Sequence, residues 1–360
     1  MLYKDTLMWK EISETPEIFA KEKQANYNVI KKLVSEIKES GIKNFVAAAR
    51  GTSDHALIYF KYILETFSEY TVGLSAPSVV TMYDGKVNYK NSIVIGCSQS
   101  GKAEDVLEVL KRANSQNAIT IAVTNDDNSP MAKTAKYHLF CSAGEEKSVA
   151  ATKTFSAELF ALLMLASELS DSAILKNSVE FVETDIKAIF GNVDKVTTAI
   201  ADKFSQMKSG FVLSRGITFA IAMEATLKLQ ETCYIQMKGY AGSDFYHGPM
   251  AMVNDKTPVF IYCAKSSYSI ETEKLVRADQ QKCIDKMVSL GAPVIVVTND
   301  KVLSDSVQGA DIAFLNLDRS EDETMFAFAL FAQMLACKIS CSIGNNPDCP
   351  RALKKVTITK

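Results

Sequence analysis

The sequence predicts an α/β protein made of two tandem, doubly wound units, each built on a parallel sheet. Apolar runs of about four to seven residues alternate with longer segments in which apolar residues recur with helical periodicity. Such runs are apolar on both faces, which is typical of parallel strands that are covered by helices on each side. An internal repeat of the pattern indicates that the unit occurs twice.

The repeat consists of matched elements that recur in the same order. The strand, Arg-Gly turn and helix expected in 44–65 recur in 210–231, and the strand and Thr-Asn-Asp turn of 118–135 recur in 292–310. A third pair of strands lies between them. An offset of roughly 165 to 175 residues is too long for a solenoid repeat, so we expect the duplication of a whole domain.

The composition divides the chain into five predicted segments. The first has an amphipathic helical pattern interrupted at Pro16, and the last carries two prolines that exclude a helix across its first half. The segments are a helical arm (1–40), a first domain (41–172), linking helices (173–208), a second domain (209–345) and an extended tail (346–360).

The charge and the cysteines limit the class of protein. The formal net charge is −2 and the pI is about 6.1, so we expect no binding to nucleic acid or to anionic lipid. No run of about eighteen apolar residues predicts a membrane span, and acidic residues near the N-terminus argue against a signal peptide. The eight cysteines stand mostly in apolar runs without metal-ligand spacing. This pattern favours free thiols in the cytoplasm and no metal site.

Three small polar turns follow strands of the first predicted unit. Ligands of parallel sheets collect beyond the carboxyl ends of the strands, where helix N-termini offer unpaired N–H groups. Hydroxyls and glycine at that place fit a phosphate, and no nucleotide-binding glycine motif is present. The alternative for the second turn is an ordinary helix N-cap. The turns are Gly51-Thr52-Ser53, Ser98-Gln99-Ser100-Gly101 and Thr124-Asn125.

The second copy of the unit lacks the pair of hydroxyl residues that the first copy has at Thr52 and Ser53. It carries charged residues in the helix that follows instead. Glu224, Lys228 and Glu231 recur at helical spacing in a mostly apolar segment. A surface ion pair would explain the spacing. The apolar surroundings indicate, however, that these charges do not all face water, and buried carboxylates are costly unless they are paired or used.

Only three histidines are available for acid–base chemistry. His247 lies in a Gly-rich loop and is the natural candidate, with a structural role as the alternative. His55 is expected near the start of the first helix of its unit. His138 falls in the segment YHLF, which we expect to be core or the edge of a sheet.

Four separated segments carry a family resemblance. They are SQSGKAEDVL, AGEEKSVAATKTFSAEL, EATLKLQETCYIQMKGYAGSDFYHGPMAM and PRALKKVTITK. Together they resemble the sugar isomerase (SIS) family from about Asn44 onward, which implies two SIS domains of flavodoxin-like type. The isomerase half of glucosamine-6-phosphate synthases is similar, and stand-alone glucosamine-6-phosphate deaminases are more similar. Because the chain starts Met-Leu-Tyr, without a cysteine after Met1, we expect no glutaminase domain.

The resemblance also implies roles for individual residues. The phosphate site falls on Ser98, Gln99 and Ser100. Thr52 and Ser53 line the sugar pocket.

The implied catalytic residues lie mainly in the second copy. Glu231 takes the role of the base that moves a proton between C1 and C2, and Lys228 lies beside it. His247 takes the ring-opening role and reaches the site from the neighbouring subunit of a homodimer. Lys355 takes the place of a lysine that contacts the open-chain sugar, in a tail that closes the active site.

Two departures from the synthase pattern concern the substrate. Lys102 and Ala103 stand where the synthases have an acid and a threonine, so one phosphate hydroxyl is absent and Lys102 is expected to replace it as a point charge. Val149 marks a backbone contact to the sugar. Ala151 stands where the synthases have a sugar-facing serine.

The reaction that the resemblance implies is the conversion of glucosamine 6-phosphate to fructose 6-phosphate and ammonia, without a metal or redox cofactor. Alternatives within enzymes are synthesis from free ammonia, plain phosphosugar isomerisation, and deglycation of a fructosamine 6-phosphate. A non-catalytic sugar-phosphate sensor is the alternative from another class. Retention of both Glu231 and His247 favours catalysis.

Overall fold

The chain forms two compact units, each with its own parallel sheet. The computed structural model describes residues 1–355. The first unit comprises Glu14–Lys147, Ala151–Glu183 and residues 353–355, and the second comprises Met1–Ser13, Ser148–Ala150 and Thr184–Ala352. The predicted domain boundaries remain a prediction.

The sheet of the first unit has five parallel strands in the order β2-β1-β3-β4-β5. All residues of β3 and β4 are buried, as expected for strands covered on both faces. The order reverses between β1 and β3, and ligands of open α/β sheets bind outside the strand ends at such a switch point. The strands are β1 (Asn44–Ala48), β2 (Thr71–Leu74), β3 (Ile93–Cys97), β4 (Ile119–Thr124) and β5 (Tyr137–Phe140).

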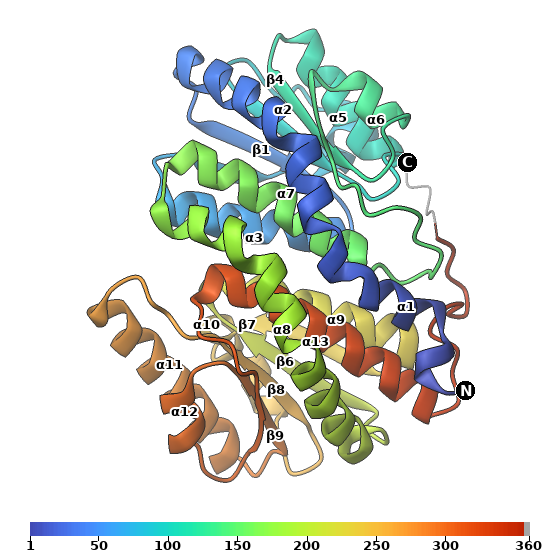
Figure 1. The fold of residues 1–360 in the computed structure, drawn as a ribbon, viewed down its shortest axis with the longest axis vertical. Helices are drawn as coiled ribbons and strands as arrows, with labels where there is room; N and C mark the ends of the chain where they lie inside the picture. The colour runs from blue at the N-terminus through green and yellow to red at the C-terminus, as the bar shows by residue number, and fades with distance from the viewer. Residues whose placement is uncertain (356–360) are drawn as a thin grey trace. The chain divides into compact units, whose positions relative to one another are not determined.

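Helices cover both faces of this sheet (Figure 1). The helix α3 packs against α7, which also packs against α2, while α5 packs against α4 and α6 on the other side. The long arm helix α2 carries buried residues at helical spacing, Ile30, Leu33 and Ile37 among them, so it is amphipathic as predicted. The helices are η2 (Thr15–Glu17), α2 (Phe19–Ser40), α3 (Thr52–Phe67), α4 (Pro77–Thr81), α5 (Glu104–Ser115), α6 (Pro130–Thr134) and α7 (Lys153–Ser170), followed by α8 (Ala173–Phe204).

The second unit repeats the same topology. Its five parallel strands have the order β10-β9-β8-β6-β7, which is the order of the first sheet when each strand is matched to its counterpart. The predicted fold class, two tandem doubly wound α/β domains after an N-terminal helical segment, is therefore confirmed. The strands are β6 (Ser209–Ser214), β7 (Gln236–Ala241), β8 (Val259–Cys263), β9 (Val294–Thr298) and β10 (Asp311–Phe314).

The helix α13 is the core helix of the second unit. It is long and apolar enough to cross a membrane by length and composition, alone among the described helices, but its apolar window is wholly buried. It packs against α9, and a helix that is apolar all round belongs in such a core. The helices are η1 (Tyr3–Asp5), α1 (Leu7–Glu14), η3 (Gly216–Thr218), α9 (Phe219–Cys233), α10 (Gly242–Phe245), η4 (Pro249–Met252), α11 (Ile270–Ser289), α12 (Lys301–Ser306) and α13 (Glu321–Ser342).

The cysteines and the tail agree with the sequence pattern. All eight cysteines are free thiols in the described chain, and seven of them are buried. The chain from Ile343 to Lys355 has no helix or strand, as the prolines predict. The remainder of the predicted tail, 356–360, lies outside the described residues.

Candidate functional site

The turn after β3 lies at the switch point of the first sheet. The Gly101 N–H donates to the Ser98 carbonyl at 3.0 Å, and the Ser98 N–H donates to the Val123 carbonyl of the neighbouring strand at 3.0 Å. The following helix α5 has its N-cap at Ala103, with no side-chain cap. The alternative that Ser98–Gly101 is a helix N-cap is therefore wrong, because the helix starts too late for its hydroxyls to cap it.

The polar side chains of this turn make few hydrogen bonds to other described residues. Ser98, Gln99 and Ser100 are all half-buried. The Ser100 hydroxyl accepts from the Lys102 N–H at 3.3 Å, whereas the side chains of Ser98 and Gln99 make no hydrogen bond within the part of the chain that the structure describes. These groups are available to a ligand at the switch point of the sheet.

The close packing of this turn requires a glycine at position 101. Its φ is +61°, and a Cβ at this position would lie 2.2 Å from the Ser129 hydroxyl oxygen. A side chain is thus excluded both by the backbone conformation and by a neighbouring residue. The glycine keeps the turn close to β4.

The turn after β1 holds its serine through a buried glutamate. Thr52 is the first residue of α3, after Gly51 at φ +55°. Ser53 is buried, and its hydroxyl donates to Oε1 of Glu158 at 2.7 Å. Glu158 is itself buried on α7. Glu158 was not singled out from the sequence, although it stands in the apolar run FSAELFALLMLA, which is the kind of surrounding that indicates a buried carboxylate.

A buried carboxylate, Glu146, organises the segment before α7. It accepts the N–H groups of Thr152 and Thr154 at 2.9 and 3.1 Å, and the Thr154 hydroxyl at 2.7 Å. Lys355 donates to the same carboxylate at 2.6 Å. Burial opposes the charge of Glu146, but Lys355 and the hydrogen bonds outweigh it and lower the pKa of Glu146 below its ordinary value.

The remaining predicted ligand contacts of this region lie on or near the surface. Val149 and Ala151 are half-buried and Lys102 is exposed. The Val149 N–H donates to the Asp348 carbonyl at 3.2 Å, so this backbone donor is used within the second unit. No ion pair holds the Lys102 ammonium among the described residues, which leaves it able to approach a bound anion.

The second unit brings its three predicted charged residues together on α9. Lys228 Nζ lies 3.4 Å from Oε1 of Glu224 and 2.8 Å from Oε2 of Glu231. The side chains of Lys228 and Glu224 are wholly buried, whereas that of Glu231 is 22% exposed. The prediction that these charges do not all face water is therefore confirmed. Glu231 is the member of the cluster that a ligand can reach.

The histidines differ in their surroundings. His247 is exposed in the turn after α10, and its imidazole makes no hydrogen bond within the described chain. His55 is buried on α3. His138 lies on the edge strand β5, where its Nε2 is 2.8 Å from the Thr124 hydroxyl and burial lowers its pKa. Among the described residues, no three His, Cys, Asp or Glu side chains form a group that could hold a metal ion.

Comparison with known proteins matches this architecture. The family model described as SIS domain matches residues 40–168 and 203–341. A glutamine–fructose-6-phosphate aminotransferase (isomerizing) from Sulfolobus acidocaldarius is 29% identical over 356 residues, which cover 98% of this chain and 56% of that protein. The chain thus spans about half the length of the curated relatives that it matches.

Two solved structures share the fold. The C-terminal domain of glucosamine-fructose-6-phosphate aminotransferase from Francisella tularensis has a TM-score of 0.80 at 23% identity, covering 96% of this chain and 99% of that one. The glucosamine-6-phosphate deaminase from Thermotoga maritima has a TM-score of 0.75 at 21% identity, covering 98% and 100%. With the family match extending over both sheets, the chain belongs to the SIS domain family.

Proposed function

We propose that this protein is a cytoplasmic phosphosugar isomerase and deaminase that converts glucosamine 6-phosphate to fructose 6-phosphate and ammonia. The observation that carries the proposal is the partly exposed Glu231 carboxylate beside a wholly buried lysine, Lys228. A carboxylate held in this way can exchange a proton with a bound sugar, whereas a sensor needs no such group. The names of the relatives agree with phosphosugar chemistry.

The proposed reaction moves a proton from C2 to C1 and one from the amine nitrogen to the C1 oxygen, and it releases ammonia. His247 assists opening of the sugar ring. Glu231 takes the proton from C2 of the open-chain aldose, which leaves an enolamine across C1 and C2, and returns the proton to C1. The resulting C2 imine adds water and expels ammonia, leaving the C2 ketone of fructose 6-phosphate.

Substrate binding is assigned to residues of the first unit. The Ser98–Gly101 turn offers hydroxyl, amide and backbone groups to the phosphate, and Lys102 adds a positive charge. Thr52, at the start of α3, is proposed to face the sugar. The Ser53 hydroxyl is already bound to Glu158, so we assign it to the support of this turn.

Lys355 and His247 complete the proposal. Lys355 contacts the open-chain sugar while it is anchored by Glu146. His247 acts from the neighbouring subunit of a homodimer, as the family resemblance implies.

An ammonia-release assay on a panel of substrates tests the proposal. The panel contains glucosamine 6-phosphate, galactosamine 6-phosphate and a fructosamine 6-phosphate, and the reverse reaction is measured with fructose 6-phosphate and ammonium. We expect release from glucosamine 6-phosphate. Release only from fructosamine 6-phosphate would identify a deglycase instead, and binding without turnover on all members would identify a sensor.

The variant Glu231→Gln separates binding from chemistry. It should retain sugar-phosphate binding while turnover falls by about 10²-fold or more, because general acid–base catalysis typically contributes that much. Calorimetric titration with fructose 6-phosphate shows whether the variant is folded and binds. Full ammonia release by Glu231→Gln would show that another group is the base.

A further inference from the structure

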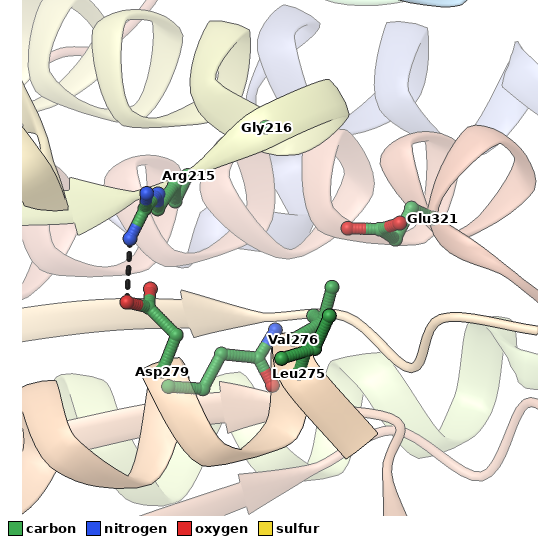
Figure 2. Close-up of a pocket in the computed structure, with 7 residues that line it drawn as sticks. Arg215, Gly216, Leu275, Val276, Asp279 and Glu321 are labelled. Atoms are coloured by element: carbon green, nitrogen blue, oxygen red, sulfur yellow. Dashed lines mark hydrogen bonds and ion pairs between the residues drawn. The ribbon is translucent and has the colours of Figure 1, made fainter. Parts of the chain in front are cut away.

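The second unit contains a pocket that the proposed reaction does not use. Its volume is about 360 Å³, and it is lined by Arg215, Gly216, Leu275, Asp279, Gln280 and Glu321, among others. This is within the range of about 300 to 1,000 Å³ that is usual for small-molecule sites. Figure 2 shows the side chains of Arg215 and Glu321 at opposite ends of the pocket, with those of α11 facing them.

The pocket lies where the topology of the second sheet favours a ligand. Arg215 and Gly216 follow β6, and α11 is the helix after β8. The order of the sheet reverses between these two strands, so the pocket is at the switch point of the second sheet. In the first unit the matching switch point carries the Ser98–Gly101 turn.

The charge pattern at the two switch points is partly shared. Arg215 forms an ion pair with Asp279 of α11 at 2.5 Å, as Arg50 does with Asp105 of α5 at 2.7 Å in the first unit. Because Asp279 already neutralises Arg215, the guanidinium offers little net charge to a second anion. The pocket therefore lacks the free positive charge that a phosphate needs.

The acceptors of this pocket, in contrast, are only partly satisfied: the Glu321 carboxylate has no cation, and one amide oxygen has no donor among the described residues. Glu321 is only 6% exposed, and no cation pairs with it among the described residues. Burial raises its pKa to about 7, although the Ser266 hydroxyl lowers it in part. The Gln280 amide donates to the Ala264 carbonyl at 2.9 Å, while its Oε1 is buried and lacks a hydrogen-bond partner in the described chain.

A ligand that satisfies these groups must bring hydrogen-bond donors. An ammonium group fits the carboxylate of Glu321, since a buried carboxylate is stabilised by a paired cation. Hydroxyl groups fit Gln280 and the Arg215–Asp279 pair. The volume admits a single hexose, and Leu275 and Val276 at the edge of the pocket offer apolar contacts to the C–H face of a sugar ring.

We infer that this pocket is a second binding site, for an amino sugar without a phosphate group, with its ammonium on Glu321 and its hydroxyls toward Gln280 and Arg215. The site is separate from the residues to which we assign turnover. Its occupation can therefore be tested by binding alone, whatever reaction the protein catalyses.

Isothermal titration of the full chain with four probes tests the inference. D-glucosamine is expected to bind. N-acetylglucosamine, which keeps the hydroxyls but has no ammonium, should bind about tenfold or more weakly because a charge-assisted hydrogen bond is lost. Glucose should behave like N-acetylglucosamine, and inorganic phosphate should not compete with glucosamine for the pocket.

Variants locate the site. Glu321→Gln should weaken glucosamine binding by about tenfold or more, and Gln280→Leu should weaken it independently, which keeps the test valid if one variant fails to fold. Glu271→Gln, an exposed change on α11, is the matched control and should leave binding unchanged. The inference would be overturned if the wild type and both pocket variants bound glucosamine with equal affinity. It would also be overturned if N-acetylglucosamine bound more tightly than glucosamine, or if glucosamine did not bind the wild type.

Discussion

Lys355 Nζ lies 2.6 Å from Oε2 of Glu146, a carboxylate whose side chain is wholly buried. The pair joins the end of the described chain to the segment that leads into α7. The same carboxylate caps the Thr152 and Thr154 N–H groups. A residue predicted only as a sugar contact is therefore also a structural anchor, and its removal should affect stability as well as activity.

The substitution Lys355→Met leaves the Glu146 charge without its cation. We expect the free energy of unfolding to fall by about 1–3 kcal/mol, the usual range when a charged buried group loses a hydrogen-bond partner. Urea denaturation measures the change. Lys354→Met is the matched control, because Lys354 is exposed and such surface changes stay within about 0.5 kcal/mol. Equal stability of the two variants would contradict the anchoring role.

The buried carboxyl of Glu22 predicts an unusual dependence of stability on pH. Burial and the charge of Glu158 raise the pKa of Glu22 well above its ordinary value of 4.5, and neither oxygen has a hydrogen-bond partner among the described residues. The folded protein thus keeps a proton that the unfolded chain loses above pH 4.5. The contribution of this proton to stability is complete below that pH and is lost as pH rises through the folded pKa.

The variant Glu22→Gln removes this dependence. As pH rises above about 4.5, the free energy of unfolding of this variant should increase relative to that of the wild type, by at most about 1.4 kcal/mol per pH unit. Denaturant midpoints between pH 4 and pH 8 measure the difference. Glu39→Gln, an exposed change on the same helix α2, should run parallel to the wild type. A constant difference across this range for Glu22→Gln would show that Glu22 is charged in the fold.

The turn glycine Gly101 should not tolerate alanine. Gly101 and Gly144 have similar backbone conformations, with φ of +61° and +67°, but a Cβ meets Ser129 at the first and nothing within 4 Å at the second. Gly101→Ala should therefore cost about 1–3 kcal/mol more than Gly144→Ala, since only the first is overpacked. Thermal denaturation of the two variants measures the difference, and equal costs would mean that the turn moves freely away from β4.

The side chains of Ser98 and Gln99 should matter for substrate affinity and little for folding. Ser98→Ala and Gln99→Ala each remove a group that has no partner within the described protein, so stability should stay within about 0.5 kcal/mol. The KM for the sugar phosphate should rise by about tenfold, since hydrogen bonds to charged groups are worth about 1.5–3 kcal/mol. Ser115→Ala, at the exposed C-terminal end of α5, the helix that follows this turn, is the control. An unchanged KM in both variants would move the phosphate away from this turn.

The sequence did not predict the short edge strands or two of the buried carboxylates. The edge strands β2 and β7 were not predicted, because TVGL and QMKGYA lack the apolar runs of the central strands. Glu22 and Glu146 were not singled out either. A glutamate in an amphipathic helix or a loop has the same local pattern whether it is exposed or buried.

The sequence by itself determined the two-fold repeat, the doubly wound class and the Glu224–Lys228–Glu231 helix face, because periodicity and duplication are properties of the chain alone. Only the tertiary structure decided that the Ser98 turn is not a helix cap, that Ser53 is bound to Glu158 and that Lys355 is paired with Glu146. It also revealed the pocket at the second switch point. These features depend on contacts between residues far apart in the sequence, and the ionisation of a carboxyl depends on the burial and charges that such contacts create.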